Sequence, residues 1–215
     1  MMTIGGRNPN AWHNWYHLIG STYGTWLRGD PRGFRTYRHR MHIEGDYHNP
    51  PPEYRYQFLF DYSKRSLRYP PVILNNEQRR IICGSMLQRF QIDGVEVAAL
   101  AILSNHFHLL SRFPELTPQQ RKRFNLSILH DGRDPAPRHF VGLARKHASF
   151  ILSEHHLKPP SRVWASRPKC LPVNDQQHHQ HAFNYIAHHA EQQAAVYLID
   201  RGFLFDYDQN SGDAP

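Results

Sequence analysis

The pattern of apolar and polar positions is clearest between residues 95 and 113. An apolar run over 95–103 follows the turn signal Asp93-Gly94, and a second run over 105–113 comes directly after it. Apolar runs of this length, bounded by turn residues, are typical of buried strands. The two runs therefore predict an antiparallel pair of strands joined by a tight turn.

Apolar residues at helical spacing predict three helices. Asn75 or Asn76 can cap a helix that ends near residue 91, and Asp175 can cap one that ends near residue 193. The third helix covers residues 138–155, where an amphipathic pattern is clear. A shorter segment over 116–129 is expected to be partly helical.

Aromatic and β-branched residues predict a first strand over 15–27 and a last strand over 169–173. The order strand, helix, strand, strand, helix, strand, helix indicates an α+β fold. It favours a ferredoxin-like antiparallel sheet with its helices on one face. Residues 34–69 show little periodicity and are interpreted as a long insertion after the first strand. Residues 203–215 are interpreted as a frayed tail, and 1–215 as a single domain.

Two histidines on the second central strand are the first candidate for chemistry. Side chains alternate along a strand, so His106 and His108 project from one face while Phe107 and Leu109 enter the core on the other. Two imidazoles fixed side by side on a rigid strand make half of a metal site. An HxH pair alone is also used by zinc hydrolases, so this signal is only moderately specific.

The last helix supplies the second candidate. Tyr185 and His189 are four positions apart and share one helix face, which His181 extends. Near the histidine strand, they would place a nucleophile beside a three-ligand metal site. A phenol with a pKa of about 10 is a weak nucleophile at neutral pH unless its proton is withdrawn. A polar, exposed helix with an incidental tyrosine is the structural alternative.

Charge and composition indicate the partner. The 215 residues carry a formal net charge of +8, which suggests a polyanion such as nucleic acid. Cys83 and Cys170 have neither metal-site nor disulfide-framework spacing, which fits a reducing cytoplasm. Neither a signal peptide nor a membrane-spanning segment is evident, so we expect a cytoplasmic protein without a membrane partner.

Arginine and lysine clusters are the expected phosphate contacts, and those interleaved with aromatic residues suit single-stranded DNA. The basic residues assigned to DNA binding are Arg35, Arg38, Arg40, Arg121, Lys122, Arg123, Arg145 and Lys146. Each cluster is equally compatible with a solvated surface. Trp26 and Trp164 are expected in the core rather than as platforms for bases, because their neighbours are apolar.

Several of these motifs resemble a known family. Asn-His-Phe-His-Leu-Leu at 105–110 is similar to the HUH signature, in which U is a bulky apolar residue. Tyr185 on a late helix, after Trp164 and the Pro-Val-Asn-Asp approach at 172–175, is similar to the single-tyrosine HUH transposases. The REP-associated tyrosine transposases are the branch it resembles most, also through Tyr-Gly-Thr-Trp-Leu at 23–27 and the turn that follows.

The resemblance implies a ferredoxin-like core, a Mg²⁺ or Mn²⁺ ion, and cleavage of single-stranded DNA near a hairpin through a 5′-phosphotyrosine. Carried over, His106 and His108 become metal ligands and Tyr185 the nucleophile. The third ligand falls on His189, with His188 as the alternative, and the ring nitrogens should converge on one ion. Relatives occur as monomers and as homodimers.

Two positions depart from the family pattern. Ser104 stands where proline is common, and residues 185–190 read Tyr-Ile-Ala-His-His-Ala rather than Tyr-Ile-x-x-Asn-Pro. Imidazole suits Zn²⁺ and other borderline metals better than Mg²⁺, so we expect Mn²⁺ to support activity better than Mg²⁺, and Zn²⁺ to bind. A zinc-dependent hydrolase and a non-catalytic nucleic-acid-binding module are the alternative functions.

Overall fold

The computed structural model describes residues 11–31, 34–35, 42–43, 56–129 and 132–205. The chain divides into two compact units. The larger unit consists of Met1–Gly20, Leu74–Lys158 and Arg167–Pro215, and the smaller one of Ser21–Ile73 and Pro159–Ser166. All of the predicted metal ligands and Tyr185 belong to the larger unit.

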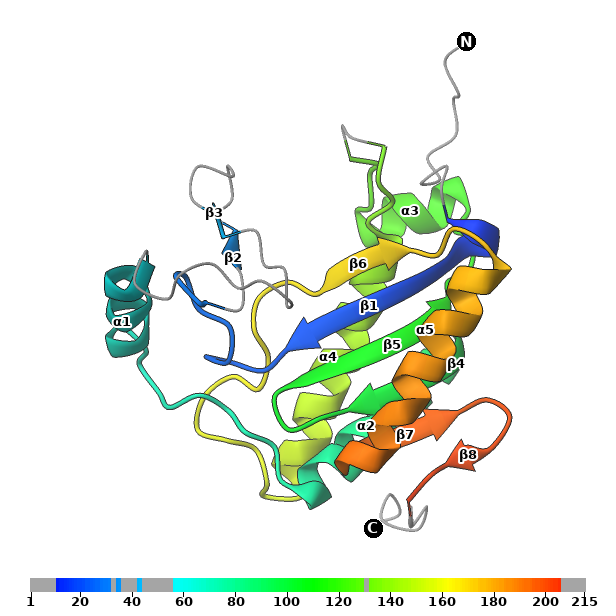
Figure 1. Cartoon of the computed structure of the whole chain (residues 1–215). Helices are drawn as coiled ribbons and strands as arrows, with labels where there is room; N and C mark the ends of the chain where they lie inside the picture. The colour runs from blue at the N-terminus through cyan, green and yellow to red at the C-terminus, as the bar shows by residue number, and fades with distance from the viewer. Residues whose placement is uncertain (1–10, 32–33, 36–41, 44–55, 130–131, 206–215) are drawn as a thin grey trace. The chain divides into compact units, whose positions relative to one another are not determined.

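A six-stranded sheet forms the larger unit, in the order β6-β1-β5-β4-β7-β8 (Figure 1). The pairings of β1 with β6, β4 with β5 and β7, and β7 with β8 are antiparallel. The strands are β1 (Trp15–Ser21), β4 (Glu96–Ile102), β5 (His106–Arg112), β6 (Lys169–Pro172), β7 (Ala195–Leu198) and β8 (Gly202–Phe203). The α+β class and the central hairpin of β4 and β5 are therefore as predicted.

The helices begin where the sequence indicates. Asn75 caps α2 (Asn76–Ile92) and forms a reciprocal capping box with Gln78, while Asp175 caps α5 (Gln176–His188) by accepting from the backbone N–H of His178. The other helices are α3 (Pro118–Phe124) and α4 (Ala136–Glu154), and one-turn 3₁₀ helices stand at η1 (Trp12–Asn14) and η3 (His189–Gln192). The last helix thus ends as a tight 3₁₀ turn.

The helices lie on both faces of the sheet, which corrects the expectation that they share one face. Figure 1 shows α5 in front of the sheet and α2 with α4 behind it. Both faces of the sheet are apolar at β4, because its side chains point alternately to one face and to the other. Ala99 and Ala101 share a core cluster with Ala182 and Ile186 of α5. The alternating positions of β4 face the other side, where α2 and α4 pack.

Strands β7 and β8 were not predicted from the sequence. Both are short, and β7 forms the far neighbour of β4 only after α5 has crossed the sheet. Phe203, the first residue of the expected tail, lies in β8 and pairs with Tyr197 of β7. Residues 206–215 lie outside the described part of the chain. Among the described helices, none has an apolar stretch long enough to cross a membrane.

Gly20 marks a close approach between β1 and β5 and gives a test of the packing. A Cβ atom at this position would lie 2.2 Å from Cε1 of the buried Phe107 ring. We expect Gly20→Ala to lower the free energy of unfolding by about 1–3 kcal/mol, because the well-packed Phe107 must shift. Urea denaturation measures this.

Gly142→Ala is the matched control, because nothing lies within 4 Å of its added Cβ and it stands on helix α4. That change is expected to raise stability by about 0.5–1 kcal/mol. A Gly20→Ala variant as stable as the original chain would contradict the packing.

The smaller unit contains β2 (Phe34–Arg35), β3 (His42–Ile43) and α1 (Gln57–Arg65), all within the predicted insertion. Its turn after β1 is fixed by Thr22, whose hydroxyl donates to the Val72 carbonyl at 2.7 Å. Trp164 is buried, as expected, whereas Trp26 is 43% exposed and so is not a core residue.

Candidate functional site

The strand that carries the two histidines lies inside the sheet. β5 has β1 on one side and β4 on the other, so its backbone is paired along both edges. His106 and His108 project toward α5, while Phe107 and Leu109 are fully buried on the opposite face. His108 is also buried, and His106 is half-buried at the start of the strand. The predicted alternation is therefore present.

Helix α5 brings Tyr185 and His189 to this strand. Ala182 and Ile186 of α5 are buried in the core against the sheet. Tyr185, next to Ile186, therefore lies at the border between the buried and the exposed face of the helix. The Tyr185 ring centroid lies 5.1 Å from that of His108 and 4.8 Å from that of His189, edge-on to both. His189 is 5% exposed and Tyr185 is 51% exposed, so one is enclosed and the other reaches solvent.

The two candidates for the third histidine are separated by the structure. His189 packs against both strand histidines, with ring centroids 5.0 Å from His108 and 6.3 Å from His106. His188 is exposed and lies 3.2 Å from a carboxylate oxygen of Glu191. The alternative third ligand, His188, therefore faces away from the cluster.

A fourth histidine, His17, belongs to the cluster and was missed from the sequence. It lies on β1, and its Nε2 is 3.0 Å from Nδ1 of His108. Its ring centroid is also 6.3 Å from that of Tyr185. The available signal was one histidine in the aromatic and β-branched segment at 15–21, alternating with Tyr16 and Leu18.

The Nδ1 atoms of the three predicted ligands all have a partner. Nδ1 of His106 bonds Oδ1 of Asn105 at 2.6 Å, and Nδ1 of His189 bonds Oε1 of Gln192 at 3.1 Å. An amide oxygen only accepts, so Nδ1 of both rings carries a proton, and in the neutral imidazole Nε2 then carries the lone pair. This is the tautomer in which a histidine binds a metal through Nε2.

Burial keeps the centre of the cluster uncharged. Desolvation, with neighbouring histidines as a second cause, lowers the pKa of His108 to about 2 and that of His17 to about 4. Both pKa values lie below neutral pH, so the two rings are neutral imidazoles there. Neutral imidazole is also the form that binds divalent metals.

The donor atoms suit a metal, but the rings do not converge. Among the described residues, no three His, Cys, Asp or Glu side chains are arranged so that they could hold an ion. The His108 and His189 rings instead stack, with 23° between their planes. The buried Nε2 of His189 has no hydrogen-bond partner, so this nitrogen is available to bind a metal ion.

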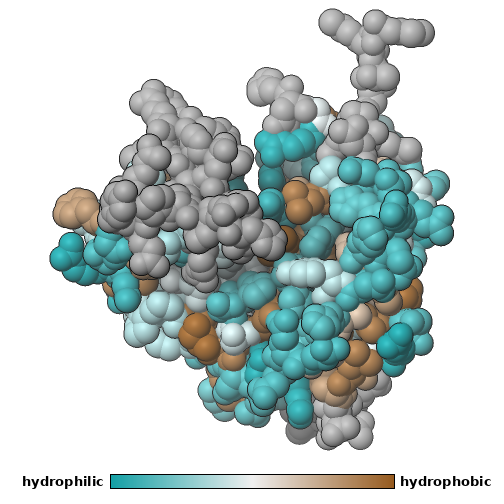
Figure 2. Space-filling view, in the orientation of Figure 1, coloured by the Kyte–Doolittle hydropathy of each residue, from teal (hydrophilic) through white to brown (hydrophobic). Residues whose placement is uncertain are grey.

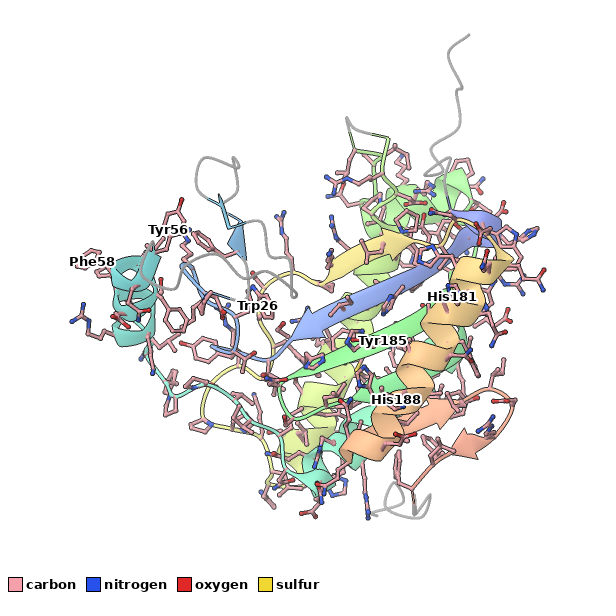
Figure 3. The ribbon with its side chains drawn as sticks, viewed as in Figure 1. Trp26, Tyr56, Phe58, His181, Tyr185 and His188 are labelled. Carbon is pink, nitrogen blue, oxygen red and sulfur yellow. The ribbon has the colours of Figure 1, made fainter. Side chains whose placement is uncertain are left out.

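The outward face of α5 is polar along its length. Its exposed residues include His181, Asn184, Tyr185 and His188, and Figure 3 shows the labelled three following the helix. The surface over α5 is mostly hydrophilic (Figure 2). Tyr185 therefore lies on an open polar surface rather than in an apolar crevice, which leaves room for a polymer.

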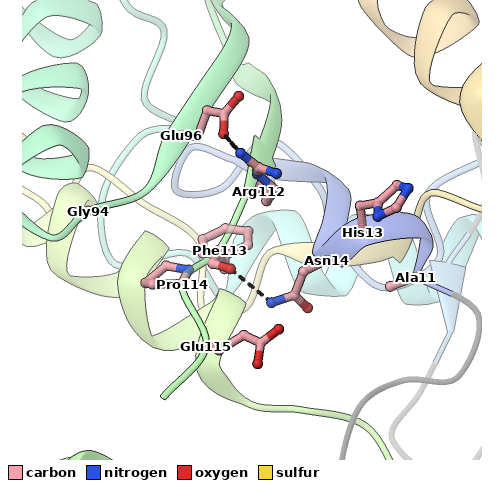
Figure 4. A pocket seen from close by; sticks show the side chains of 9 residues that line it. All are labelled: Ala11, His13, Asn14, Gly94, Glu96, Arg112, Phe113, Pro114 and Glu115. Carbon is pink, nitrogen blue, oxygen red and sulfur yellow. Dashed lines mark hydrogen bonds and ion pairs between the residues drawn. The ribbon is translucent and has the colours of Figure 1, made fainter. Parts of the chain in front are cut away.

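A cavity of about 500 Å³ lies elsewhere, where β4 begins and β5 ends, at the end of this strand pair away from His106 (Figure 4). Arg112 pairs with Glu96 at its wall, and Asn14 Nδ2 donates to the Phe113 carbonyl at 2.8 Å. The four clustered histidines and Tyr185 are not among the residues that line it. The candidate site therefore does not coincide with this cavity.

Several of the basic residues assigned to DNA binding are not exposed, unpaired side chains in the described part of the chain. Arg145 is only 8% exposed on the packed face of α4, which disfavours a phosphate contact there. Arg121 forms a two-fold salt bridge with Asp134, at 3.0 and 2.6 Å. Arg38 and Arg40 lie outside the described residues, and Arg35 is described by its backbone alone in β2.

Lys122, Arg123 and Lys146 are exposed and remain candidates for phosphate contacts. Replacing Lys122 and Arg123 together with alanine is expected to weaken single-stranded DNA binding. The slope of log affinity against log salt should become shallower by about 1.4, or about 0.7 per lost phosphate contact. A fluorescence anisotropy titration at several salt concentrations measures both effects. An unchanged slope would place the DNA on another surface.

Comparisons with known proteins give a likeness in structure but none in sequence. No family model matches the chain, and no curated protein matches its sequence. The solved structure of a REP-associated tyrosine transposase bound to a REP hairpin is similar over 89% of this chain and 74% of that one. It has 9% sequence identity and a TM-score of 0.40. Similarity at this level establishes no family, so function has to be inferred from the site.

Proposed function

We propose that the protein cleaves single-stranded DNA and transfers the cut strand through a covalent bond to Tyr185. The fold would then be a ferredoxin-like core of the HUH endonuclease type. One observation carries the proposal: Tyr185, half-exposed on α5, contacts the rings of His108 and His189 beside His106. A phenol that reaches solvent next to three imidazoles combines a nucleophile with the donor set of a metal site.

The covalent step exchanges one ester bond for another. The Tyr185 oxygen attacks the phosphorus, a new O–P bond forms, and the bond to the 3′ oxygen breaks. The phenol proton passes to solvent, which the 51% exposed side chain reaches, and the leaving 3′ oxygen takes up a proton. The 5′-phosphotyrosine keeps the ester bond energy, so attack by another 3′ hydroxyl rejoins DNA without a nucleotide cofactor.

The residues that would hold a divalent metal are His106, His108 and His189, each through Nε2. A divalent metal would offset the negative charge on a non-bridging phosphate oxygen. Binding would require these rings to rearrange, because no three of the described His, Cys, Asp or Glu side chains are arranged to hold an ion. Three imidazoles favour Mn²⁺ over Mg²⁺ and also accept Zn²⁺.

An end-labelled hairpin with a single-stranded flank tests the proposal. With Mn²⁺, DNA labelled at its 3′ end should migrate with the protein on a denaturing gel, and DNA labelled at its 5′ end should yield a short free fragment. Chelation of Mn²⁺ should stop both. The opposite pattern of labels would indicate a 3′-phosphotyrosine. Absence of any adduct over a range of hairpins would favour a non-catalytic nucleic-acid-binding module.

A further inference from the structure

We infer that His17 is a positioning residue of this site, which orients His108 and determines which of its nitrogens is available to a metal. The inference rests on the metal site of the proposed function. It adds a residue from a third segment of the chain, β1, to a site otherwise built from β5 and the end of α5. Three observations support it.

The first observation is the position of His17. β1 is the sheet neighbour of β5, and Tyr16 and Leu18 are buried in the core while Gly20 lies against Phe107. The side chain of His17 therefore points to the face that α5 covers, directly beside His108. Their ring centroids are 5.2 Å apart. The hydrogen bond joins two sheet strands, so both partners are held by paired backbone.

The second observation concerns the proton between the two rings. The contact between His17 Nε2 and His108 Nδ1 is 3.0 Å, and only one of these atoms can carry the hydrogen. If His108 donates, its Nε2 has a lone pair and can bind a metal. If His17 donates, the proton of neutral His108 sits on Nε2 and blocks it. A metal at Nε2 therefore requires His17 to act as the acceptor.

The third observation is that His106 and His189 follow the same rule. Each uses Nδ1 to donate to an amide oxygen, from Asn105 and Gln192 respectively. Partners of this kind orient metal ligands and fix their tautomers. In the same way, His17 accepts the proton on Nδ1 of His108 and so fixes the orientation and tautomer of that ring. It also holds His108 in place, so His189, on the 3₁₀ turn η3, is the ring expected to move when a metal binds.

The experiment uses the full-length protein and Mn²⁺ alone, followed by electron paramagnetic resonance of the free ion. His17→Leu removes the acceptor and is expected to raise the Kd for Mn²⁺ by about 10- to 100-fold. His17→Gln places an amide oxygen near the position of Nε2 and is expected to restore affinity close to that of the original chain. His17→Met provides a second variant without a strong acceptor if His17→Leu does not fold.

His147→Leu is the matched control. His147 also makes one side-chain hydrogen bond between two elements, from its Nε2 to Oε1 of Gln88 at 3.2 Å, which joins α4 to α2. Its loss should leave Mn²⁺ binding unchanged. In DNA cleavage, His17→Leu should raise the Mn²⁺ concentration that gives half-maximal rate and leave the maximal rate largely intact, which a general loss of structure would not do.

The outcomes separate this inference from the proposed function. Folded His17→Leu that binds Mn²⁺ as tightly as the original chain overturns the inference, and so does His17→Gln that binds as weakly as His17→Leu. An original chain that binds no Mn²⁺ overturns it as well. If the expected Mn²⁺ affinities are found but the original chain forms no DNA adduct, the proposed function fails while the role of His17 stands.

Discussion

Tyr185→Phe is expected to form no covalent complex with single-stranded hairpin DNA, a loss of at least about a thousand-fold in strand cleavage. The change removes one oxygen and keeps the ring that packs edge-on against His108 and His189. Binding of the same DNA should therefore be nearly unchanged. Denaturing gels measure the adduct, and anisotropy measures binding.

Tyr62→Phe is the matched control, because Tyr62 is a tyrosine of similar exposure, 58% against 51%, on helix α1. It should form the adduct normally. An adduct formed by Tyr185→Phe would place the nucleophile on another residue. Cleavage that continues without any adduct in this variant would favour a zinc-dependent hydrolase, in which the histidines act and the tyrosine is dispensable.

His106→Ala is expected to reduce metal-dependent cleavage by more than about 100-fold. Loss of an outer partner of a metal ligand already costs about 10- to 100-fold, and His106 is proposed as a ligand itself. The half-buried His106 starts β5 and lies outside the fully buried core, so the fold should persist, as a thermal melt can show. Cleavage rates over a Mn²⁺ titration measure the effect.

The same titration on His147→Ala controls for loss of an imidazole away from the site. Its rate should match that of the original chain. If His106→Ala cleaves normally while a chelator still inactivates the original chain, the metal lies elsewhere than on β5.

Local patterns were sufficient for much of the fold. Asn75 and Asp175 mark the starts of α2 and α5 because an N-cap acts within one turn of its helix. The shared face of His106 and His108 follows from strand alternation, which needs no knowledge of the rest of the chain. The face on which α5 packs depends instead on a chain crossover, and no residue of α5 encodes it alone.

The site was predictable only where its residues follow a regular spacing. Tyr185 and His189 are one helical turn apart and were found together. His17 is a lone histidine among aromatic neighbours, and only the placement of β1 next to β5 brings it beside His108. The stacking of His108 on His189 depends on ring torsions, and the burial of Arg145 on how α4 packs, so spacing predicts neither.

The hydrogen bond between His17 and His108 joins residues 91 positions apart, and Tyr185 comes from the last α-helix. A ribosome therefore releases the strand histidines long before Tyr185. β7, which flanks β4, emerges later still, after α5. Such non-local contacts form late in folding. A nascent or truncated chain that ends before residue 185 would hold the histidines without the tyrosine, so the proposed strand cleavage would require synthesis to have passed α5.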